Sequence, residues 1–335
     1  MDLRSVIAAG AEGHGLNHAQ ALRLFRELRT GSEEHYLAMH AAADLSRRTF
    51  AGAEIHAQIG VNWGPCRMDC EFCVFGERHG IAIEPIELSP EEAAREAARF
   101  VADGAHAIYL MDTADFPLGR FLVVARAVRE AIGLDVPLIA NTGDFAEDGA
   151  RRLVEAGFSG VYHVRRLGEG TRSRIPPEKR WNTMRCARAA GLEVASCLEP
   201  IGPEHTPEEI TDALFQALEA SVTMYATMRR VPVPGTALAA HGMIPEAGLA
   251  RHTAIVRLVA GDRIRGMGVH EPNVVSLLAG ANVIYAETGP NPRDTAKDTS
   301  EGRGRSVATC RAFLCEAGQS PRDRSALQTC VRRSA

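Results

Sequence analysis

The feature that most restricts the fold of this 335-residue chain is a series of short apolar segments that alternate with helical patterns from residue 55 onward. Eight segments have the length and apolar content of buried strands: 55–61, 107–111, 136–141, 160–164, 193–198, 222–227, 263–269 and 282–285. Strands that alternate with helices pair in parallel, and eight such units can close on themselves. We therefore expect an α/β fold, a (β/α)8 TIM-type barrel.

Two of the helical segments carry strong start signals. Residues 89–92 and 206–209 read Ser-Pro-Glu-Glu and Thr-Pro-Glu-Glu, which is a cap, a first-turn proline and acidic residues at the positive end of a helix. We expect helices to begin there and to run to about residues 102 and 221. Apolar spacing predicts further helices over 118–132, 146–156, 177–190 and 248–260.

The two ends of the chain lie outside this alternation. Residues 17–48 have helical patterns, with Asn17 as a candidate cap. We therefore expect an N-terminal helical extension over residues 1–50 and the barrel over 51–305. A C-terminal helix and tail would occupy 306–335.

Composition limits the classes of function. A net charge of -4 gives no electrostatic footprint for nucleic acid, so no nucleic-acid partner is expected. No uncharged apolar run reaches the roughly 18 residues of a membrane helix, and the first residues lack the features of a signal peptide. The 8 cysteines are too few for a disulfide scaffold in a chain of this length. A reducing cytoplasm is the expected location.

A loop directly after the first expected strand holds Cys66, Cys70 and Cys73 at a C-x3-C-x2-C spacing. This spacing lets three thiolates point into one small pocket, and thiolates are the preferred ligands of iron–sulfur clusters. Three thiolates on a four-iron cluster would leave one iron open to a small chelating molecule. Zinc needs a fourth ligand, and no second cysteine or histidine pair follows at zinc spacing. A zinc knuckle and three unrelated core cysteines are the alternatives.

Polar residues stand at the carboxyl end of nearly every expected strand. In a parallel barrel these ends meet on one face, where active sites lie. The sequence therefore predicts a shared site at that face. The residues are Asp112, Thr113, Asp115, Asn141, Thr142, Asp144, Arg165, Arg166, Glu199, Arg229, Arg230, His270 and Glu271.

The cysteine loop, with Phe72 as an aromatic residue before the last cysteine, resembles that of the radical S-adenosylmethionine (SAM) superfamily. Segments 162–169, 197–204, 231–238 and 278–282 resemble its biotin-synthase-like branch, so the resemblance spans about residues 20–318. It implies a [4Fe–4S] cluster on the three cysteines and SAM bound at the open iron. The implied reaction is reductive cleavage of SAM to a 5′-deoxyadenosyl radical, which abstracts hydrogen from an unactivated C–H bond. A ferredoxin or flavodoxin would supply the electron.

The same resemblance implies roles for individual residues. In that branch an arginine and an acidic residue after the fourth strand face the cofactor, and Arg165 and Glu169 have the matching types. Arg180 matches a second arginine on the following helix, and Ile201 and Gly202 match a motif whose backbone contacts adenine. The expected cofactor contacts are Phe72, Asp112, Asn141, Arg165, Glu169, Arg180, Ile201 and Gly202. The expected substrate contacts are Arg229, Arg230, Arg265 and His270.

The resemblance departs from biotin synthase itself at a second cluster. Biotin synthases hold a sulfur-donating cluster with three cysteines on barrel strands and one arginine. Those positions align with Leu110, Ala140, Ala195 and Arg265, so only the arginine keeps its type. Biotin synthase activity is therefore not expected.

Three cysteines near the C-terminus offer another set of ligands. Cys310, Cys315 and Cys330 could hold an auxiliary cluster, as in the two-protein lipoyl synthases that this branch resembles. The alternative is that Cys310 and Cys315 pack in a terminal helix.

These observations lead to three hypotheses about function. The first is sulfur insertion of the lipoyl synthase type, on a small or carrier-protein-bound substrate and with a paired radical SAM protein. The second is chemistry without sulfur insertion, as in the radical SAM protein of iron-guanylylpyridinol cofactor synthesis. The third is a non-catalytic cluster-binding partner subunit or electron carrier.

Overall fold

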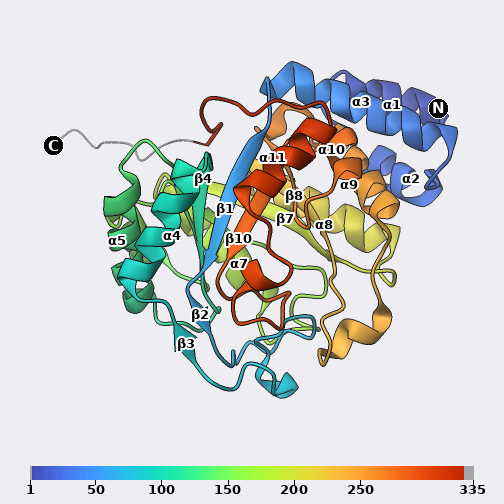
Figure 1. Ribbon diagram of the computed structural model, residues 1–335. Helices are drawn as coiled ribbons and strands as arrows, with labels where there is room; N and C mark the ends of the chain where they lie inside the picture. Colours follow the sequence, from blue (N-terminus) through green and yellow to red (C-terminus); the bar gives the residue numbers. More distant parts are fainter. Residues whose placement is uncertain (1, 328–335) are drawn as a thin grey trace.

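The computed structural model describes residues 2–327, and within them eight parallel strands close into a barrel (Figure 1). Around the wall the order follows the chain, and the last strand pairs with the first. The strands are β1 (Glu54–Gly60), β4 (Ala107–Met111), β5 (Leu138–Asn141), β6 (Gly160–Tyr162), β7 (Glu193–Ile201), β8 (Met224–Arg229), β9 (Met267–Val269) and β10 (Val283–Thr288). The predicted (β/α)8 barrel is confirmed.

Helices surround the barrel wall (Figure 1). They are α4 (Pro90–Ala102), α5 (Leu118–Ile132), α6 (Glu147–Glu155), α7 (Pro177–Ala189), α8 (Pro207–Glu219), α9 (Glu246–Ala260), α10 (Val274–Leu278) and α11 (Val307–Glu316). Ser89 and Thr206 form complete capping boxes with Glu92 and Glu209, as their motifs predict. The short α10 has no counterpart among the predicted helices.

Three further helices precede the barrel, and they are α1 (Leu3–Ala11), α2 (His18–Glu27) and α3 (Glu33–Phe50). They pack on α8 and α9 through buried residues such as Leu24 and Leu45. A small antiparallel pair, β2 (Asn62–Trp63) and β3 (Ile86–Glu87), lies at the opposite end of the molecule (Figure 1). Single turns of 3-10 helix occur at Glu77–His79, Ala237–His241, Gly261–Arg263 and Thr299–Glu301. No helix in the described part of the chain has the length and apolar content needed to cross a bilayer.

Side chains of alternate strand residues fill two separate apolar layers. Ile55 and Leu110 belong to the layer between the wall and the helices, whereas Tyr109, Cys197 and Tyr285 fill the barrel interior. This alternation follows from the two-residue period of a strand. It decides which residue of each strand end faces the barrel axis.

The alternation also corrects the alignment with the biotin synthase cluster ligands. Leu110 and Ala140 pair across β4 and β5 and belong to the outer layer. They cannot occupy positions that face the barrel axis. The inward neighbours are Tyr109 and Ile139, and neither is a cysteine.

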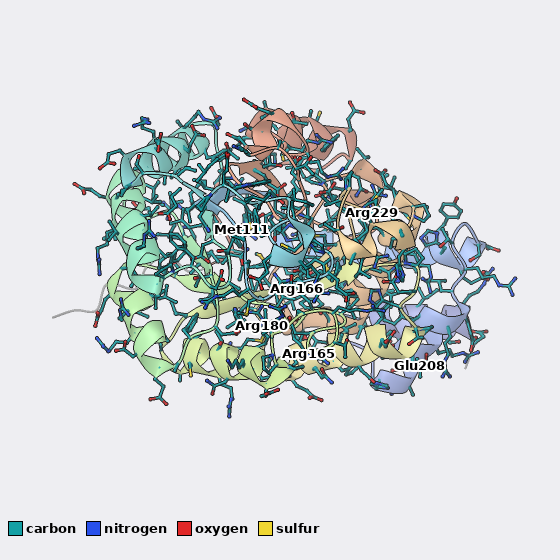
Figure 2. All side chains as sticks on the ribbon, turned by 90° about the horizontal axis from the view of Figure 1, so that it is seen from below. Met111, Arg165, Arg166, Arg180, Glu208 and Arg229 are labelled. Carbon is teal, nitrogen blue, oxygen red and sulfur yellow. The ribbon has the colours of Figure 1, made fainter. Side chains whose placement is uncertain are left out.

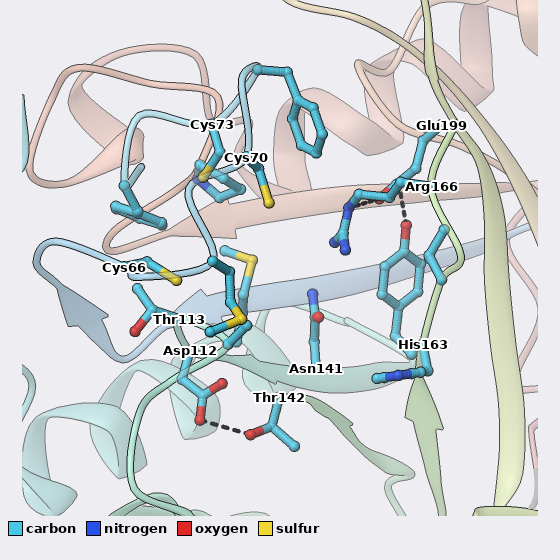
Figure 3. Close-up of a pocket in the computed structure, with 18 of the residues that line it drawn as sticks. Cys66, Cys70, Cys73, Asp112, Thr113, Asn141, Thr142, His163, Arg166 and Glu199 are labelled. Carbon is cyan, nitrogen blue, oxygen red and sulfur yellow. Dashed lines mark hydrogen bonds and ion pairs between the residues drawn. The ribbon is translucent and has the colours of Figure 1, made fainter. Parts of the chain in front are cut away.

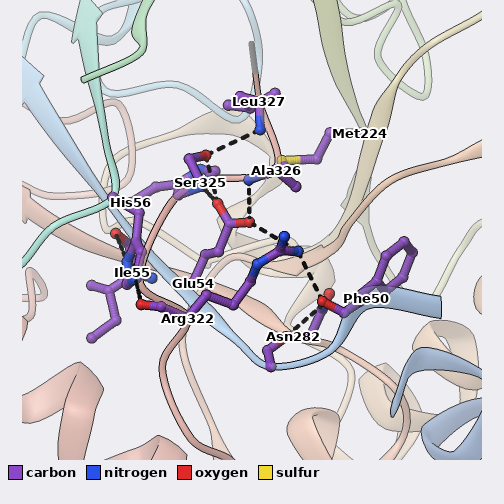
Figure 4. A network of polar contacts seen from close by, with 12 residues as sticks. Phe50, Glu54, Ile55, His56, Met224, Asn282, Arg322, Ser325, Ala326 and Leu327 are labelled. Atoms are coloured by element: carbon purple, nitrogen blue, oxygen red, sulfur yellow. Dashed lines mark hydrogen bonds and ion pairs between the residues drawn. The ribbon is translucent and has the colours of Figure 1, made fainter. Parts of the chain in front are cut away.

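The amino end of the barrel is closed by the C-terminal segment (Figure 4). The buried carboxylate of Glu54 accepts hydrogen bonds from Ser325 Oγ and from the Ala326 N–H, both at 2.6 Å. His56 Nε2 lies 2.9 Å from the same carboxylate, and Leu327 packs into the interior cluster. Ligands can therefore reach the barrel interior from the carboxyl end.

This closure predicts a specific acid sensitivity. Burial opposes ionisation of Glu54, but contacts with His56, Ser325 and Ala326 outweigh it and hold its pKa at about 2, against 4.5 ordinarily. Ionised Glu54 therefore stabilises the fold above pH 4.5, and this contribution is lost as the pH falls towards 2. We expect the free energy of unfolding of the wild type to fall up to about 3 kcal/mol further than that of Glu54→Gln over this interval. Denaturant titrations at several pH values measure this, with Glu91→Gln as an exposed control, and parallel curves would contradict it.

Candidate functional site

A pocket opens at the carboxyl ends of the barrel strands, with a volume of about 960 Å³ including the part open to solvent (Figure 3). Every barrel strand or the loop that follows it contributes to the wall. The contributing residues, in strand order, include Gln58, Met111, Asn141, Tyr162, Glu199, Met228, His270 and Arg293. The structure thus brings residues from the whole length of the barrel into one site.

The cysteine loop forms one side of this pocket. The Cys66 N–H donates to the Phe75 carbonyl at 2.6 Å, and the Cys73 N–H donates to the Cys70 carbonyl at 3.0 Å. Asp69 has a positive φ of 56°, a left-handed conformation that Asp tolerates better than most residues and that turns the chain between the first two cysteines. As a result Cys66, Cys70 and Cys73 all line the pocket (Figure 3).

The loop fits a cluster better than a single metal ion. Among residues 2–327 no three His, Cys, Asp or Glu side chains lie close enough together to hold one ion, which argues against a zinc knuckle. A [4Fe–4S] cluster takes each thiolate on a different iron and so requires separated thiols. Burial raises the pKa of Cys66 to about 12 and also raises the pKa values of Cys70 and Cys73. The thiols would therefore stay protonated until a cationic iron centre binds.

A fixed arginine faces the loop across the pocket. The Arg166 Nε forms an ion pair with Glu199 Oε1 at 3.0 Å, and the Tyr162 hydroxyl donates to Glu199 Oε2 at 2.6 Å (Figure 3). The guanidinium carbon lies 6.0 Å from the centre of the Phe72 ring. Burial opposes the charge, but Glu199 and other acidic groups outweigh it and raise the pKa of Arg166. This arrangement presents a permanent cation beside the cysteines.

Arg180 supplies a second cation at the pocket wall. Its Nη1 lies 3.3 Å from Asp144 Oδ1, and its Nε lies 3.4 Å from Glu169 Oε2. Glu169 is buried beneath Arg180 and does not line the pocket, so it positions the arginine. His163 Nε2 lies 2.9 Å from Asp144, and burial lowers the pKa of His163 to about 4. His163 is therefore neutral at physiological pH.

Two polar atoms at the pocket wall have no hydrogen-bond partner among the described residues: Asp112 Oδ1 and His270 Nε2. Asp112 Oδ2 accepts a hydrogen bond from Thr142 at 2.9 Å, and burial raises the pKa of Asp112 well above its ordinary value. His270 stacks on Tyr285 with ring centres 4.0 Å apart, and burial together with Arg293 and His56 lowers its pKa far below the usual range. A buried polar atom without a partner costs about 1–3 kcal/mol. A ligand that bonds to these atoms would remove that cost.

The prediction that Arg165 faces the cofactor is wrong. Its Nη1 donates to Gln216 Oε1 on α8 at 2.9 Å, and it does not line the pocket (Figure 2). The inward positions of β6 and its extension are Tyr162 and Val164, so the next inward position is Arg166. The pocket-facing arginine is therefore the neighbour of the one that the resemblance selected.

Four more predicted contacts lie outside the pocket. Arg230 is buried in an ion pair with Glu204, and its guanidinium occupies the space that a side chain at Gly202 would need. The Ile201 carbonyl accepts the Arg230 N–H, and the Ile201 side chain packs in the outer layer. Arg229 pairs with Glu246 at the start of α9. None of these four residues lines the pocket.

Arg265 lies at the wrong end of the barrel for a substrate contact. It precedes β9, and its Nη1 lies 2.8 Å from Glu193, the first residue of β7. The amino ends of parallel strands meet opposite the pocket. The position of Arg265 therefore does not support the substrate contact predicted for it.

The C-terminal cysteines do not converge within the described residues. Cys310 is buried in α11, where its Sγ donates to the Tyr285 carbonyl at 3.4 Å, outside the barrel wall. Cys315 is exposed on the same helix, and neither cysteine lines the pocket. Cys330 lies outside the described residues. Cys310 is packed in a terminal helix, which is the alternative to a cluster ligand that the sequence left open.

No ligand-binding role was predicted for Arg166, Glu199 or Arg293, although all three line the pocket. Arg166 and Glu199 could have been found by counting two-residue steps inward from Tyr162 and Cys197. Arg293 offered no such signal, because it lies in the loop after β10. That loop joins the site through the Val74 N–H, which donates to the Pro292 carbonyl at 3.0 Å.

Comparison with known proteins agrees with this geometry. Residues 65–217 match the family model described as the Radical SAM superfamily, and they contain the cysteine loop, Arg166, Arg180 and Glu199. This segment is therefore similar to a radical SAM domain. It is 28% identical over 272 residues to a biotin synthase of Streptomyces avermitilis, covering 78% of this chain and 68% of the relative. A biotin synthase of Magnetococcus marinus is 28% identical over 253 residues, which cover 70% of this chain and 77% of the relative. These relatives support the biotin-synthase-like branch.

Two solved structures share the fold. Methylornithine synthase (PylB) superposes with a TM-score of 0.79 at 19% identity, covering 95% of this chain and 97% of that chain. The [FeFe]-hydrogenase maturase HydG superposes with a TM-score of 0.79 at 15% identity, and the superposition covers 97% of this chain and 76% of that chain. At these identities the likeness concerns the fold.

The neighbouring arginines allow a matched test of the site. We expect Arg166→Gln to weaken SAM binding by roughly tenfold or more, because it removes a charged group from the pocket. Arg165→Gln should leave the affinity unchanged, since that side chain bonds to α8 outside the pocket. Anaerobic equilibrium titration of the reconstituted protein with SAM measures both. Equal affinities for the two variants would contradict the assignment.

Proposed function

We propose that this radical SAM enzyme abstracts a hydrogen atom from an unactivated C–H bond of a small substrate bound within the barrel, without an auxiliary cluster. One observation carries the proposal. Among the described residues, the cysteines that line the pocket are Cys66, Cys70 and Cys73; seven of the eight strand ends add polar groups around them, and β8 contributes Met228. This arrangement supports one cluster with an iron that no cysteine ligates, and one substrate-binding pocket beside it.

The residues around the loop divide the tasks of cofactor binding. The three cysteines would hold the cluster, and Arg166 and Arg180 provide cations for the SAM carboxylate. The unpartnered Asp112 Oδ1 can form a hydrogen bond to the ligand, and Asn141 can donate and accept hydrogen bonds to its polar groups. When bound, the cluster and SAM together supply reductive carbon–sulfur cleavage and a 5′-deoxyadenosyl radical. Phe72 and Phe75 line the same side of the pocket and exclude water from it.

The opposite wall suggests what kind of substrate fits. Arg293 is held by Glu271 at 2.6 Å and by Glu287, whereas the two carboxylates beside Arg180 lie 3.3 and 3.4 Å away, so Arg293 has less hydrogen-bonding capacity left for a ligand. His270 is neutral and offers an unpartnered Nε2. We infer that the substrate meets this wall with a neutral hydrogen-bonding group.

Sulfur insertion of the lipoyl synthase type is the second candidate. Its support is the exposed Cys315, which could act as a ligand together with Cys330, a residue outside the described part of the chain. Such an enzyme would need a second cluster close to the pocket. The positions of Cys310 and Cys315 do not favour this candidate.

The reaction class has a direct test. Anaerobically reconstituted protein mixed with dithionite and SAM should release 5′-deoxyadenosine and methionine, which mass spectrometry detects. Cys66→Ala should abolish release, whereas Cys186→Ala, a buried cysteine of α7, should not. Absence of 5′-deoxyadenosine from wild-type protein with an intact cluster would favour the non-catalytic partner subunit or electron carrier.

The number of clusters separates the two enzymatic candidates. We expect about four irons and four sulfides per chain, with no change in Cys315→Ala or Cys310→Ala. Chemical analysis of iron and sulfide measures this. About eight irons, falling to about four in these variants, would instead establish the sulfur-inserting candidate.

A further inference from the structure

Four arginines surround the cysteine loop on its solvent side, and we call Arg67, Arg78, Arg172 and Arg174 the arginine collar. Their side chains are exposed by 74%, 41%, 48% and 56%. Two belong to the cysteine loop region and two to the segment before α7, so the fold assembles the collar from distant parts of the chain. The loop lies at the end of the molecule opposite α1, α2 and α3 (Figure 1).

The acidic partners of the collar lie beneath it. Asp69, exposed by 1%, pairs with Arg78 at 2.8 Å and with Arg174 at 3.0 Å. Glu71, exposed by 17%, pairs with Arg78 at 3.2 Å and with Arg172 at 3.0 Å. The carboxylates therefore face the protein and the guanidinium groups face outward. The four arginines are matched in number by Asp69, Glu71, Asp115 and Glu77, so the layering places positive charge outermost without an excess of it.

The collar is centred on one cluster ligand. Asp69 and Glu71 are the residues on either side of Cys70, so each neighbour of this cysteine carries two collar arginines. Arg67 follows Cys66 and pairs with Asp115 at 3.3 Å. One partner, Glu77, is itself well exposed and pairs with Arg174 at 2.7 Å. Apart from that group, a protein that approaches Cys70 from solvent meets positive charge.

We propose that the arginine collar is the docking surface for a small acidic electron-carrier protein, which delivers electrons to the cluster from the side of Cys70. The proposal rests on the proposed function, because a cluster that cleaves SAM must be reduced in every cycle. The carrier loses one electron and the cluster gains one, and no bond changes in this step. Complementary charge speeds such encounters and makes them sensitive to salt.

The experiment compares two reductants on the same variants. The double variant Arg67→Gln/Arg172→Gln leaves both arginines on Asp69 in place. We expect its apparent KM for an acidic flavodoxin to rise roughly three- to thirtyfold, because two exposed charges are lost from the contact. SAM cleavage driven by dithionite should stay at the wild-type rate, since dithionite needs no docking surface. The flavodoxin-driven rate should also fall less steeply with added salt than in the wild type.

Two matched variants serve as controls. Arg67→Lys/Arg172→Lys keeps the charge and should keep the flavodoxin KM near the wild-type value. Arg26→Gln/Arg47→Gln removes two exposed arginines from α2 and α3 and should have no effect. A flavodoxin KM unchanged in the collar variant would overturn the proposal. Equal losses with flavodoxin and dithionite would overturn it as well, because they would indicate that the arginines only hold the loop in place.

A binding measurement separates this proposal from the proposed function. Oxidised flavodoxin titrated into the chain without SAM should bind the wild type more tightly than the collar variant, in a salt-dependent manner. This result does not depend on turnover. If the wild type releases no 5′-deoxyadenosine even with dithionite, the proposed function fails while the titration still tests the collar.

Discussion

Closure of the strand ring is the constraint on which the rest of the structure depends. Because β10 pairs with β1, the carboxyl ends of all the barrel strands surround one opening, and residues separated by more than 200 positions share a pocket. Within each strand, alternation then decides which side chain faces the axis. The amino end is closed by Glu54 and the C-terminal segment, so a ligand approaches from the cysteine-loop side.

Charge at the opening is arranged in pairs before any ligand arrives. Arg166 is held by Glu199, Arg180 by Asp144 and Glu169, and Arg293 by Glu271 and Glu287. Buried ion pairs cost desolvation free energy, so such pairs are weak evidence for added stability. Their effect here is to fix the orientation of three long side chains. Asp112 and His270 differ from these paired arginines, because each has a polar atom at the pocket wall with no hydrogen-bond partner among residues 2–327.

Arginines are also held by acidic partners on the outer, solvent-facing side of the cysteine loop. Buried carboxylates next to Cys70 hold exposed guanidinium groups. The same ion pairs therefore order the loop and place the guanidinium groups at the surface. The cysteine loop thus faces a ligand pocket on one side and a charged surface on the other. Both faces are set by residues between Gly64 and Arg78 and by their partners, which are Asp115 after β4 and the segment after β6.

The sequence by itself determined the barrel, the helix caps at Ser89 and Thr206 and the three cysteines of the loop. These depend on local periodicity and on short motifs, which a single chain displays directly. Only the tertiary structure decided that Arg166 and not Arg165 faces the pocket, that Arg265 lies at the opposite end, and that Cys310 packs outside the wall. The first depends on which way one side chain points, since a shift of one residue along a strand reverses that direction. The other two depend on where the segment before β9 and helix α11 lie relative to the barrel. Arg293 and the arginine collar depend on contacts between loops that are far apart in the chain, and no local pattern encodes such contacts.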